Sequence, residues 1–257
     1  MKFKNIIKAV TIAVLTAALL FGCARPAEIS YSEHLTLTAT YPHSTESFTQ
    51  GLFFHNGEMF ESVGRYGSSA VYKNIVLENG ERSKEALLDS SIFAEGSVVF
   101  EDKLFLLTWK ENKVMVMNPE TLDLIDEIAY PREGWGLTTD GKHLIASDGS
   151  SSLYFMDSKL NDIKKLIVTL NGEETENINE LEYIDGCIWA NVWLSNKILI
   201  IDADSGEVIK SLDFSGLYDN PSSDVDDTMN GIAYNHLTEK IYVTGKRWNT
   251  LFEFEIK

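Results

Sequence analysis

The sequence is poor in the residues that bind metals or form disulfides. Its 257 residues include two cysteines, Cys23 and Cys187, and five histidines. None of them has the spacing of a Cys/His metal site. Once Cys23 is assigned to lipid, Cys187 has no partner for an internal disulfide. The composition therefore predicts neither a disulfide-rich domain nor a zinc site.

Basic residues are also scarce. The chain has 22 lysines and arginines against 39 aspartates and glutamates, which gives a formal net charge of −17 at pH 7. A nucleic-acid partner needs basic patches that neutralise phosphates, so this balance argues against nucleic acid. An acidic surface favours solubility and attracts cationic peptides.

Long hydrophobic runs are missing as well. The apolar stretch 9–20 is too short to favour a membrane-crossing helix and has about the length of the h-region of a signal peptide. Three lysines, Lys2, Lys4 and Lys8, precede it. Residues 1–22 are therefore predicted to be a signal peptide.

The leader ends in the motif Leu20-Phe21-Gly22-Cys23, which resembles the cleavage box of bacterial lipoproteins. It predicts lipidation of Cys23, followed by a short tether over residues 23–33. The protein would then be exported and held by lipid alone, on the periplasmic or cell-surface side of a bacterial membrane. The alternative is an ordinary secretory signal with a chance cysteine.

A cassette of two short strands and a polar turn occurs five times. Its copies read QGLFFHNGEMFES, EGSVVFEDKLFLL, WGLTTDGKHLIAS, NELEYIDGCIWAN and NGIAYNHLTEKIYV, and they begin at Gln50, Glu95, Trp135, Asn179 and Asn230. The copies are about 40 to 50 residues apart, which is the period of a four-stranded propeller blade. Alternating apolar residues and Asx-Gly turns favour β-hairpins. The sequence predicts an all-β fold, a five-bladed β-propeller that forms one domain over residues 34–257.

Two sets of repeat-equivalent positions are candidates for a functional site. The innermost strands of a propeller line a central channel, so equivalent positions converge in space. The first set is the five lead residues, and the second, at the end of the second strand, comprises Gly64, Trp109, Gly149, Trp193 and Lys246. Aromatic walls with a few convergent polar groups are typical of a small-ligand site. The alternative is that the tryptophans fill the channel as core and that Glu95 and Lys246 form an ordinary ion pair.

Nine short segments in and around the cassettes form an ordered set. They read FTQGL, ESVGRYG, FAEG, GWGL, SDG, NELEY, WANVW, NGIA and TGK, between about residue 41 and the C-terminus. This set resembles the glutaminyl-peptide cyclotransferases of the plant and bacterial type. Two positions depart from the family pattern, Ala94 where glycine is common and Arg247 where members vary, and neither is a proposed catalytic group.

The resemblance implies a five-bladed propeller that converts an N-terminal glutamine into pyroglutamate with release of ammonia. Its substrates would be N-terminal glutaminyl peptides or proteins, and it would use no metal and no cofactor. By motif, the catalytic residues would be Glu95, Lys246 and Asn179. The substrate-binding residues would be Phe48, Gln50, Trp109, Trp135 and Trp193.

The reaction sets physical demands that these residues can meet. The α-amine of the glutamine must be neutral when it attacks the side-chain amide, although its usual pKa is about 8. Glu95, beside Trp109 and Trp135, could carry the proton of the amine to the departing ammonia if apolar surroundings raise its pKa. Lys246 and Asn179 could meet the negative charge that develops on the amide oxygen.

Two other functions fit parts of the same pattern. A calcium-dependent lactone or ester hydrolase would use Glu95, Asn179 and Asn230 as oxygen ligands. The aspartate-rich segment 224–227 matches no calcium loop and is interpreted as a solvated connection. A non-enzymatic surface lipoprotein would bind peptides or glycans through the aromatic rim. The chain is expected to be a monomer.

Overall fold

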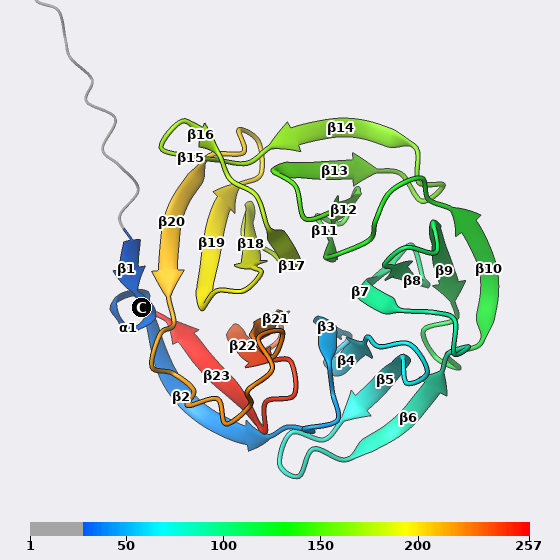
Figure 1. Cartoon of the computed structure of the whole chain (residues 1–257), viewed down its shortest axis with the longest axis horizontal. Helices are drawn as coiled ribbons and strands as arrows, with labels where there is room; N and C mark the ends of the chain where they lie inside the picture. Colours follow the sequence, from blue (N-terminus) through cyan, green and yellow to red (C-terminus); the bar gives the residue numbers. More distant parts are fainter. Residues whose placement is uncertain (1–27) are drawn as a thin grey trace, which may run out of the picture.

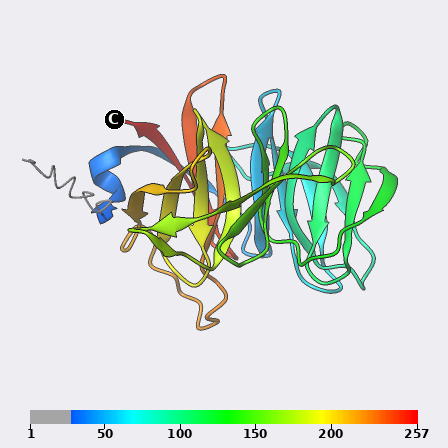
Figure 2. The same ribbon diagram turned by 90° about the horizontal axis from the view of Figure 1, so that it is seen from above.

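The computed structural model describes residues 28–257, which form five β-sheets arranged around a central axis (Figure 1). In the edge-on view the strands run across the thickness of the disc, and the loops gather on its two faces (Figure 2). The prediction of an all-β, five-bladed propeller is confirmed. The predicted signal peptide and Cys23 lie outside the described residues. No helix in this part of the chain has the length and apolar character of a membrane-crossing segment.

Three blades are antiparallel sheets of four consecutive strands, with the first strand nearest the axis (Figure 1). Blade 1 contains β3 (Thr49–His55), β4 (Glu58–Val63), β5 (Ala70–Ile75) and β6 (Arg82–Leu87). Blade 2 contains β7 (Ala94–Phe100), β8 (Lys103–Thr108), β9 (Lys113–Met117) and β10 (Leu124–Ala129). Blade 3 contains β11 (Leu137–Thr139), β12 (Leu144–Ser147), β13 (Ser152–Met156) and β14 (Asp162–Ile167).

The other two blades include strands from the N-terminal part of the described chain. Blade 4 contains β17 (Ile178–Ile184), β18 (Cys187–Val192), β19 (Lys197–Asp202), β20 (Val208–Asp213) and β1 (Glu28–Ser30). Blade 5 contains β21 (Met229–Asn235), β22 (Lys240–Gly245), β23 (Thr250–Ile256) and β2 (Leu35–Pro42). The remaining elements are a small hairpin, β15 (Thr169–Leu170) with β16 (Glu173–Glu174), and the helix α1 (Tyr31–His34).

Blade 5 closes the ring. Its outer strand β2 comes from the start of the described chain and pairs antiparallel with β23, the last strand, from Leu35 opposite Ile256 to Pro42 opposite Thr250. The C-terminus therefore lies beside α1 (Figure 1). Opening the ring would break this pairing, so both ends of the described chain stabilise the same blade.

The described part of the predicted tether, residues 28–33, packs on the propeller. Strand β1 pairs in parallel with β20, with Ile29 opposite Leu212, and Tyr31 stacks on Phe214 at a centroid distance of 4.9 Å. Residues 28–33 thus pack on the propeller, and their assignment to a tether is wrong. Ile29 and Tyr31 bury apolar surface along the edge of β20, which would be open to solvent without β1. The short segment shows no clear alternation of apolar and polar residues, so the sequence did not indicate a strand there.

The core lies between the blades. Along β8, Leu104 and Leu106 point to one face of the sheet and pack with blade 1, whereas Phe105 and Leu107 point to the other face and pack with blade 3. Within residues 28–257, five clusters of buried apolar side chains fill the five spaces between neighbouring blades in this way. Each sheet is covered on both faces, so the blades form one rigid ring that holds its inner strands in place.

The innermost strands are irregular where the cassettes begin. In blades 1, 2, 4 and 5 the register with the second strand shifts at the lead residue, which marks a β-bulge. A bulge turns a side chain that would otherwise alternate with its neighbours. Neighbouring blades also approach each other closely here, because a Cβ on Gly136 would lie only 2.0 Å from the carbonyl oxygen of Asn179. The lead side chains are thereby directed toward the central channel.

Candidate active site

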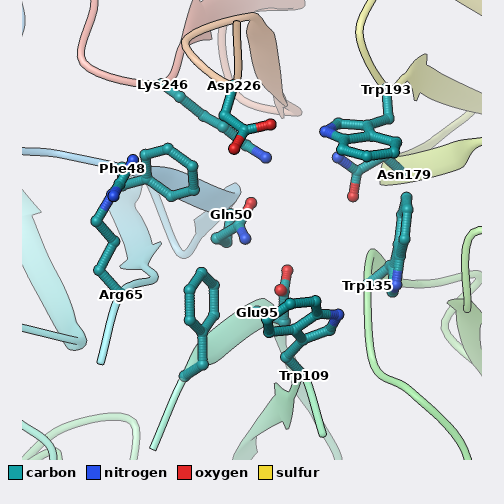
Figure 3. Close-up of a pocket in the computed structure, with 11 residues that line it drawn as sticks. Phe48, Gln50, Arg65, Glu95, Trp109, Trp135, Asn179, Trp193, Asp226 and Lys246 are labelled. Carbon is teal, nitrogen blue, oxygen red and sulfur yellow. The ribbon is translucent and has the colours of Figure 1, made fainter. Parts of the chain in front are cut away.

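A cavity of about 210 Å³ opens at the channel and is lined by residues of all five blades (Figure 3). Its lining comprises Phe48, Gln50, Arg65, Phe93, Glu95, Trp109, Trp135, Asn179, Trp193, Asp226 and Lys246. All eight residues that the sequence predicted for catalysis or substrate binding are among them. Seven of the ten residues of the two repeat-equivalent sets line the cavity, and Gly64, Gly149 and Asn230 do not.

The cavity has a buried polar floor and a half-buried rim. Gln50, Glu95, Asn179 and Lys246 are each at most 5% exposed. The rim is formed by half-buried residues, among them Arg65, Trp109, Trp135, Trp193 and Asp226. A small group that reaches the floor would meet an amide, a carboxyl, a second amide and an amine while being shielded from water.

Tryptophan and phenylalanine rings form the walls. Trp135 and Trp193 meet edge to face, with ring centroids 5.5 Å apart and an interplanar angle of 83°. On the other side Phe93 lies 5.4 Å from Trp109. Gly149, which follows the second strand of blade 3, makes room for one of these walls. A Cβ on Gly149 would lie 2.6 Å from the ring of Trp135.

Glu95 is a buried carboxyl group. Its pKa lies well above the ordinary value, chiefly because burial disfavours the charged form, and the positive charge of Lys246 only partly opposes this. The negative charges of Glu111 and Glu133 raise the pKa further, whereas the side chain of Gln50 lowers it. A carboxyl group of this kind can gain and lose a proton near neutral pH.

Lys246 is a buried amine. Burial lowers its pKa, and the charge of Arg65 acts in the same direction, while Glu95 and Asp226 raise it. Its Nζ lies 4.8 Å from the centroid of the Phe48 ring, a cation–π contact. In the described part of the chain no direct ion pair joins Lys246 to Glu95, so the alternative of an ordinary ion pair is not supported.

The two amides of the floor are connected below the cavity by Asn230. Nδ2 of Asn179 donates a hydrogen bond to Oδ1 of Asn230 over 3.0 Å, and Nδ2 of Asn230 donates to Oε1 of Gln50 over 3.3 Å. The Asn230 oxygen is thus already used as an acceptor. In residues 28–257 no group of three or more His, Cys, Asp or Glu side chains is arranged to hold a metal.

Two buried carboxyl groups of the innermost strand β17, those of Glu180 and Glu182, lie outside the cavity. Glu180 accepts hydrogen bonds from the backbone N–H groups of Leu52 in blade 1 and Ile232 in blade 5. Glu182 accepts one from the backbone N–H of Tyr234 over 2.8 Å. Burial raises the pKa of both groups, that of Glu182 to about 8. Their bonds join the innermost strands of different blades, which gives them a structural role.

Comparison with known proteins decides the family. The model of a protein family described as glutamine cyclotransferase matches residues 9–256. The chain belongs to the glutamine cyclotransferase family. A glutaminyl-peptide cyclotransferase of Arabidopsis thaliana is 36% identical over 230 residues, which are 87% of this chain and 71% of that protein. The resemblance of the nine segments to this family is confirmed.

A solved structure supports the assignment. The crystal structure of Myxococcus xanthus glutaminyl cyclase matches this cyclotransferase with a TM-score of 0.78 and 33% sequence identity. The match covers 87% of this chain and 96% of that chain. Fold and sequence therefore agree on the family, and the chain is an enzyme of the cyclotransferase class.

Three lining residues of this cyclotransferase were missed by the sequence reasoning. Arg65 and Phe93 lie in the segments ESVGRYG and FAEG, but they fall outside the two repeat-equivalent sets. Arg65 has a φ of 115°, a backbone conformation that is unusual for a bulky residue and that directs it to the rim. Its Cζ lies 4.3 Å from the Phe48 ring centroid. Neither the composition nor the spacing of the cassettes predicts a positive φ at Arg65.

The third missed residue, Asp226, shows that one interpretation was wrong in part. The segment 224–227 was interpreted as a solvated connection, yet Asp227 is buried and, with Asp224, forms ion pairs with Arg247. These pairs hold the segment over the cavity, and Asp226 lines it (Figure 3). One feature of the sequence points to this contact: Arg247, the ion-pair partner of the segment, directly follows the predicted site residue Lys246.

Proposed function

We propose that this protein is a metal-independent glutaminyl-peptide cyclotransferase in which Glu95 is the general acid/base. The observation that carries the proposal is a single buried carboxyl group on the floor of a tryptophan-walled cavity, within electrostatic reach of a buried lysine. A glutamine side chain and its own α-amine are small enough to share such a floor. Attack within one residue then needs orientation more than any added reagent.

Glu95 handles the proton. The substrate arrives with an ammonium group, and a carboxylate with a raised pKa can accept its proton and leave the amine neutral. The amine nitrogen then forms a bond to the amide carbon of the same side chain. As the bond between that carbon and the departing nitrogen breaks, the carboxyl group gives its proton to that nitrogen, and ammonia leaves. The carboxylate then accepts the second proton of the former amine, whose nitrogen becomes the neutral ring amide. The products are a pyroglutamyl peptide and ammonia.

Lys246 and Asn179 stabilise the amide oxygen, which gains negative charge during ring closure. The ammonium of Lys246 supplies positive charge in a site shielded from water, where it acts more strongly than in solution. Asn179 uses one N–H of its amide for Asn230 and has a second N–H to donate. Gln50 lies on the same floor and holds the amine or the first peptide carbonyl.

The aromatic walls enforce the curled shape of the substrate. Phe48, Trp109, Trp135 and Trp193 enclose the floor from several blades, so an extended side chain would meet a ring (Figure 3). Such orientation can be worth effective molarities of about 10⁵ M or more. The rest of the bound peptide would extend out of the cavity across the half-buried rim.

Localisation and assembly remain part of the proposal. We infer export and attachment to a bacterial membrane through lipid on Cys23, from the leader alone, and a monomeric protein that acts on peptide or protein N-termini. Expression of the full chain with Cys23→Ala tests the anchor. The variant is expected in the soluble fraction and the natural chain with membranes; if both fractionate alike, the anchor is not at Cys23.

The function is tested by incubating the purified protein with a glutaminyl dipeptide, with and without EDTA. Equal ammonia release in both samples, with loss of the mass of one ammonia from the peptide, is the expected result. No ammonia from folded protein would direct attention to a binding propeller. Activity that appears only on esters and only with calcium would support the hydrolase, which no contact favours because Asn179 and Asn230 bond to each other.

A further inference from the structure

Glu133 lies between two walls of the cavity without lining it. Its Oε2 accepts a hydrogen bond from Nε1 of Trp109 over 3.0 Å and another from Nε1 of Trp135 over 3.3 Å. Trp109 follows β8 in blade 2, and Trp135 precedes β11 in blade 3. One carboxylate oxygen therefore joins indoles from two blades, and Figure 3 shows these indoles as neighbours at one edge of the cavity.

The backbone next to Glu133 is held against blade 2. The N–H of Gly134 donates to the carbonyl oxygens of Thr108, over 3.1 Å, and Trp109, over 3.3 Å. A Cβ at Gly134 would lie 2.6 Å from the Cβ of Leu107, so a side chain here would prevent the approach. The close contact brings the Glu133 carboxylate to the junction of the two blades.

The two indoles held by Glu133 control further rings. Trp109 packs on Phe93, and Trp135 packs edge to face on Trp193. In a tightly packed wall a ring cannot turn without displacing its neighbour. The orientation of two indoles therefore sets the position of four aromatic side chains that line the cavity.

We propose that Glu133 is a positioning residue that fixes the two tryptophan walls and, through them, the curl of the substrate glutamine over its own amine. This inference rests on the proposed cyclotransferase function. Glu133 does not touch the cavity, so its effect must pass through Trp109 and Trp135. Its side chain is 43% exposed, so burial alone does not explain its two indole contacts, and its other carboxylate oxygen lies 3.9 Å from Nζ of Lys110.

The charge of Glu133 has a second effect, on Glu95. The negative charges of Glu133 and Glu111 raise the pKa of Glu95, and the positive charge of Lys246 lowers it. The hydroxyl of Tyr66 is hydrogen-bonded to Glu111, and the negative charge of Glu95 contributes to the raised pKa of this tyrosine. Neutralising Glu133 should therefore lower the pKa of Glu95 and move the acidic limb of the pH–rate profile to lower pH.

The hydrogen bonds can be tested without turnover. The chain contains five tryptophans, so the ¹⁵N-labelled protein gives five indole N–H signals. Glu133→Leu removes the acceptor, and the signals of two indoles, assigned with Trp109→Phe and Trp135→Phe, are expected to shift and to exchange faster with water. If fewer than two of them move, the proposal is wrong. Glu133→Ala replaces the leucine variant if that variant does not fold.

The effect on catalysis is tested with a glutaminyl dipeptide. Ammonia release by the wild-type protein comes first, so failure of the proposed function would be recognised there. In Glu133→Leu, kcat/KM is expected to fall by about 10- to 100-fold while the melting temperature stays near that of the wild type. An active wild type whose kcat/KM is unchanged by this substitution overturns the inference.

Two glutamine variants separate charge from hydrogen bonding. Glu133→Gln keeps an acceptor oxygen and loses the charge, so it should retain most of kcat and shift the acidic limb. Glu111→Gln is the matched control, because Glu111 also acts on Glu95 but is bonded to Tyr66 and not to an indole. It should shift the limb and leave the indole signals in place. A change in the indole signals of the control equal to that in Glu133→Leu would contradict the proposal.

Discussion

Asn179 and Asn230, from the innermost strands of adjacent blades, are hydrogen-bonded to each other over 3.0 Å directly below the cavity. Asn230 also donates to the backbone carbonyl oxygen of Thr49 over 2.9 Å and to Oε1 of Gln50. It is fully buried and does not line the cavity. Asn230 therefore orients two floor side chains from below.

Asn230→Ala should reduce both activity and stability. Asn179 and Gln50 would each lose the partner that orients them, and we expect kcat to fall by about 10-fold, since misplacing a catalytic group is costly. Leaving buried polar groups unsatisfied should lower the free energy of unfolding by about 1 to 3 kcal/mol. Steady-state kinetics and thermal unfolding measure the two effects. A stable variant with wild-type kcat would show that Asn230 does not orient Asn179.

Glu95→Gln should abolish most of the turnover and leave the fold intact. The substitution keeps the shape of the side chain and removes its ability to carry a proton, so kcat is expected to fall by about 10² to 10⁴-fold. Glu182→Gln is a matched control, because Glu182 is equally buried in the channel but lies outside the cavity. A Glu95→Gln protein with near-normal kcat would rule out Glu95 as the general acid/base.

Lys246→Met should lower kcat more than it raises KM. Methionine keeps the apolar stem beside Phe48 and removes the charge that the amide oxygen needs in the transition state. Loss of one such group typically costs about 10² to 10³-fold in rate. Lys113→Met, which removes a lysine paired with Glu127 on the outer strands of blade 2, controls for a general loss of charge. A pure KM effect would make Lys246 a binding group.

The pH dependence of kcat/KM should be bell-shaped, with both limbs displaced. Glu95 must be ionised to accept a proton, so activity rises through its pKa, which lies above the ordinary carboxyl range. Lys246 must be charged, so activity falls as pH rises through its pKa, which lies below the ordinary lysine value. In Lys246→Met the falling limb should disappear and the rising limb should move to higher pH, since Lys246 lowers the pKa of Glu95. A rising limb in the ordinary carboxyl range would contradict this assignment.

The architecture and most of the site could be predicted because the repeat is expressed in the sequence. Equivalent cassettes must occupy equivalent places in a ring, so Glu95 and Trp135 could be brought together without any knowledge of long-range contacts. The same logic failed for Asn230, which shares the lead position. Asn230 has the same bulge as the lead residues of blades 1, 2 and 4, but its side chain bonds to Gln50 and Asn179. Hydrogen bonds between side chains of different blades leave no mark in the repeat.

What could not be predicted depends on tertiary contacts between loops. Arg65 reaches the rim through a positive φ, and Asp226 reaches it because ion pairs with Arg247 hold the flanking aspartates. Glu133 stands beside a predicted site residue, yet nothing in a single sequence indicates that its carboxylate bridges two indoles. Such contacts join segments whose spacing is irregular, so the repeat carries no information about them.

Glu182→Gln should make the protein more stable at alkaline pH. Burial raises the pKa of Glu182 from its usual 4.5 to about 8, so between these values the unfolded chain releases a proton that the folded chain keeps. The stabilising effect of this group is therefore complete below pH 4.5 and is lost as the pH rises toward 8. Glutamine does not titrate and can still accept the hydrogen bond from the backbone N–H of Tyr234. Denaturant unfolding at pH 5 and pH 8 should show the variant gaining on the wild type by at least about 1 kcal/mol over this interval, since each unit of pKa shift corresponds to about 1.4 kcal/mol. The charge of Glu182 also raises the pKa of Glu180, so the substitution weakens the pH dependence that Glu180 contributes and adds to the gain of the variant. Parallel stability curves would mean that Glu182 is ionised in the folded protein.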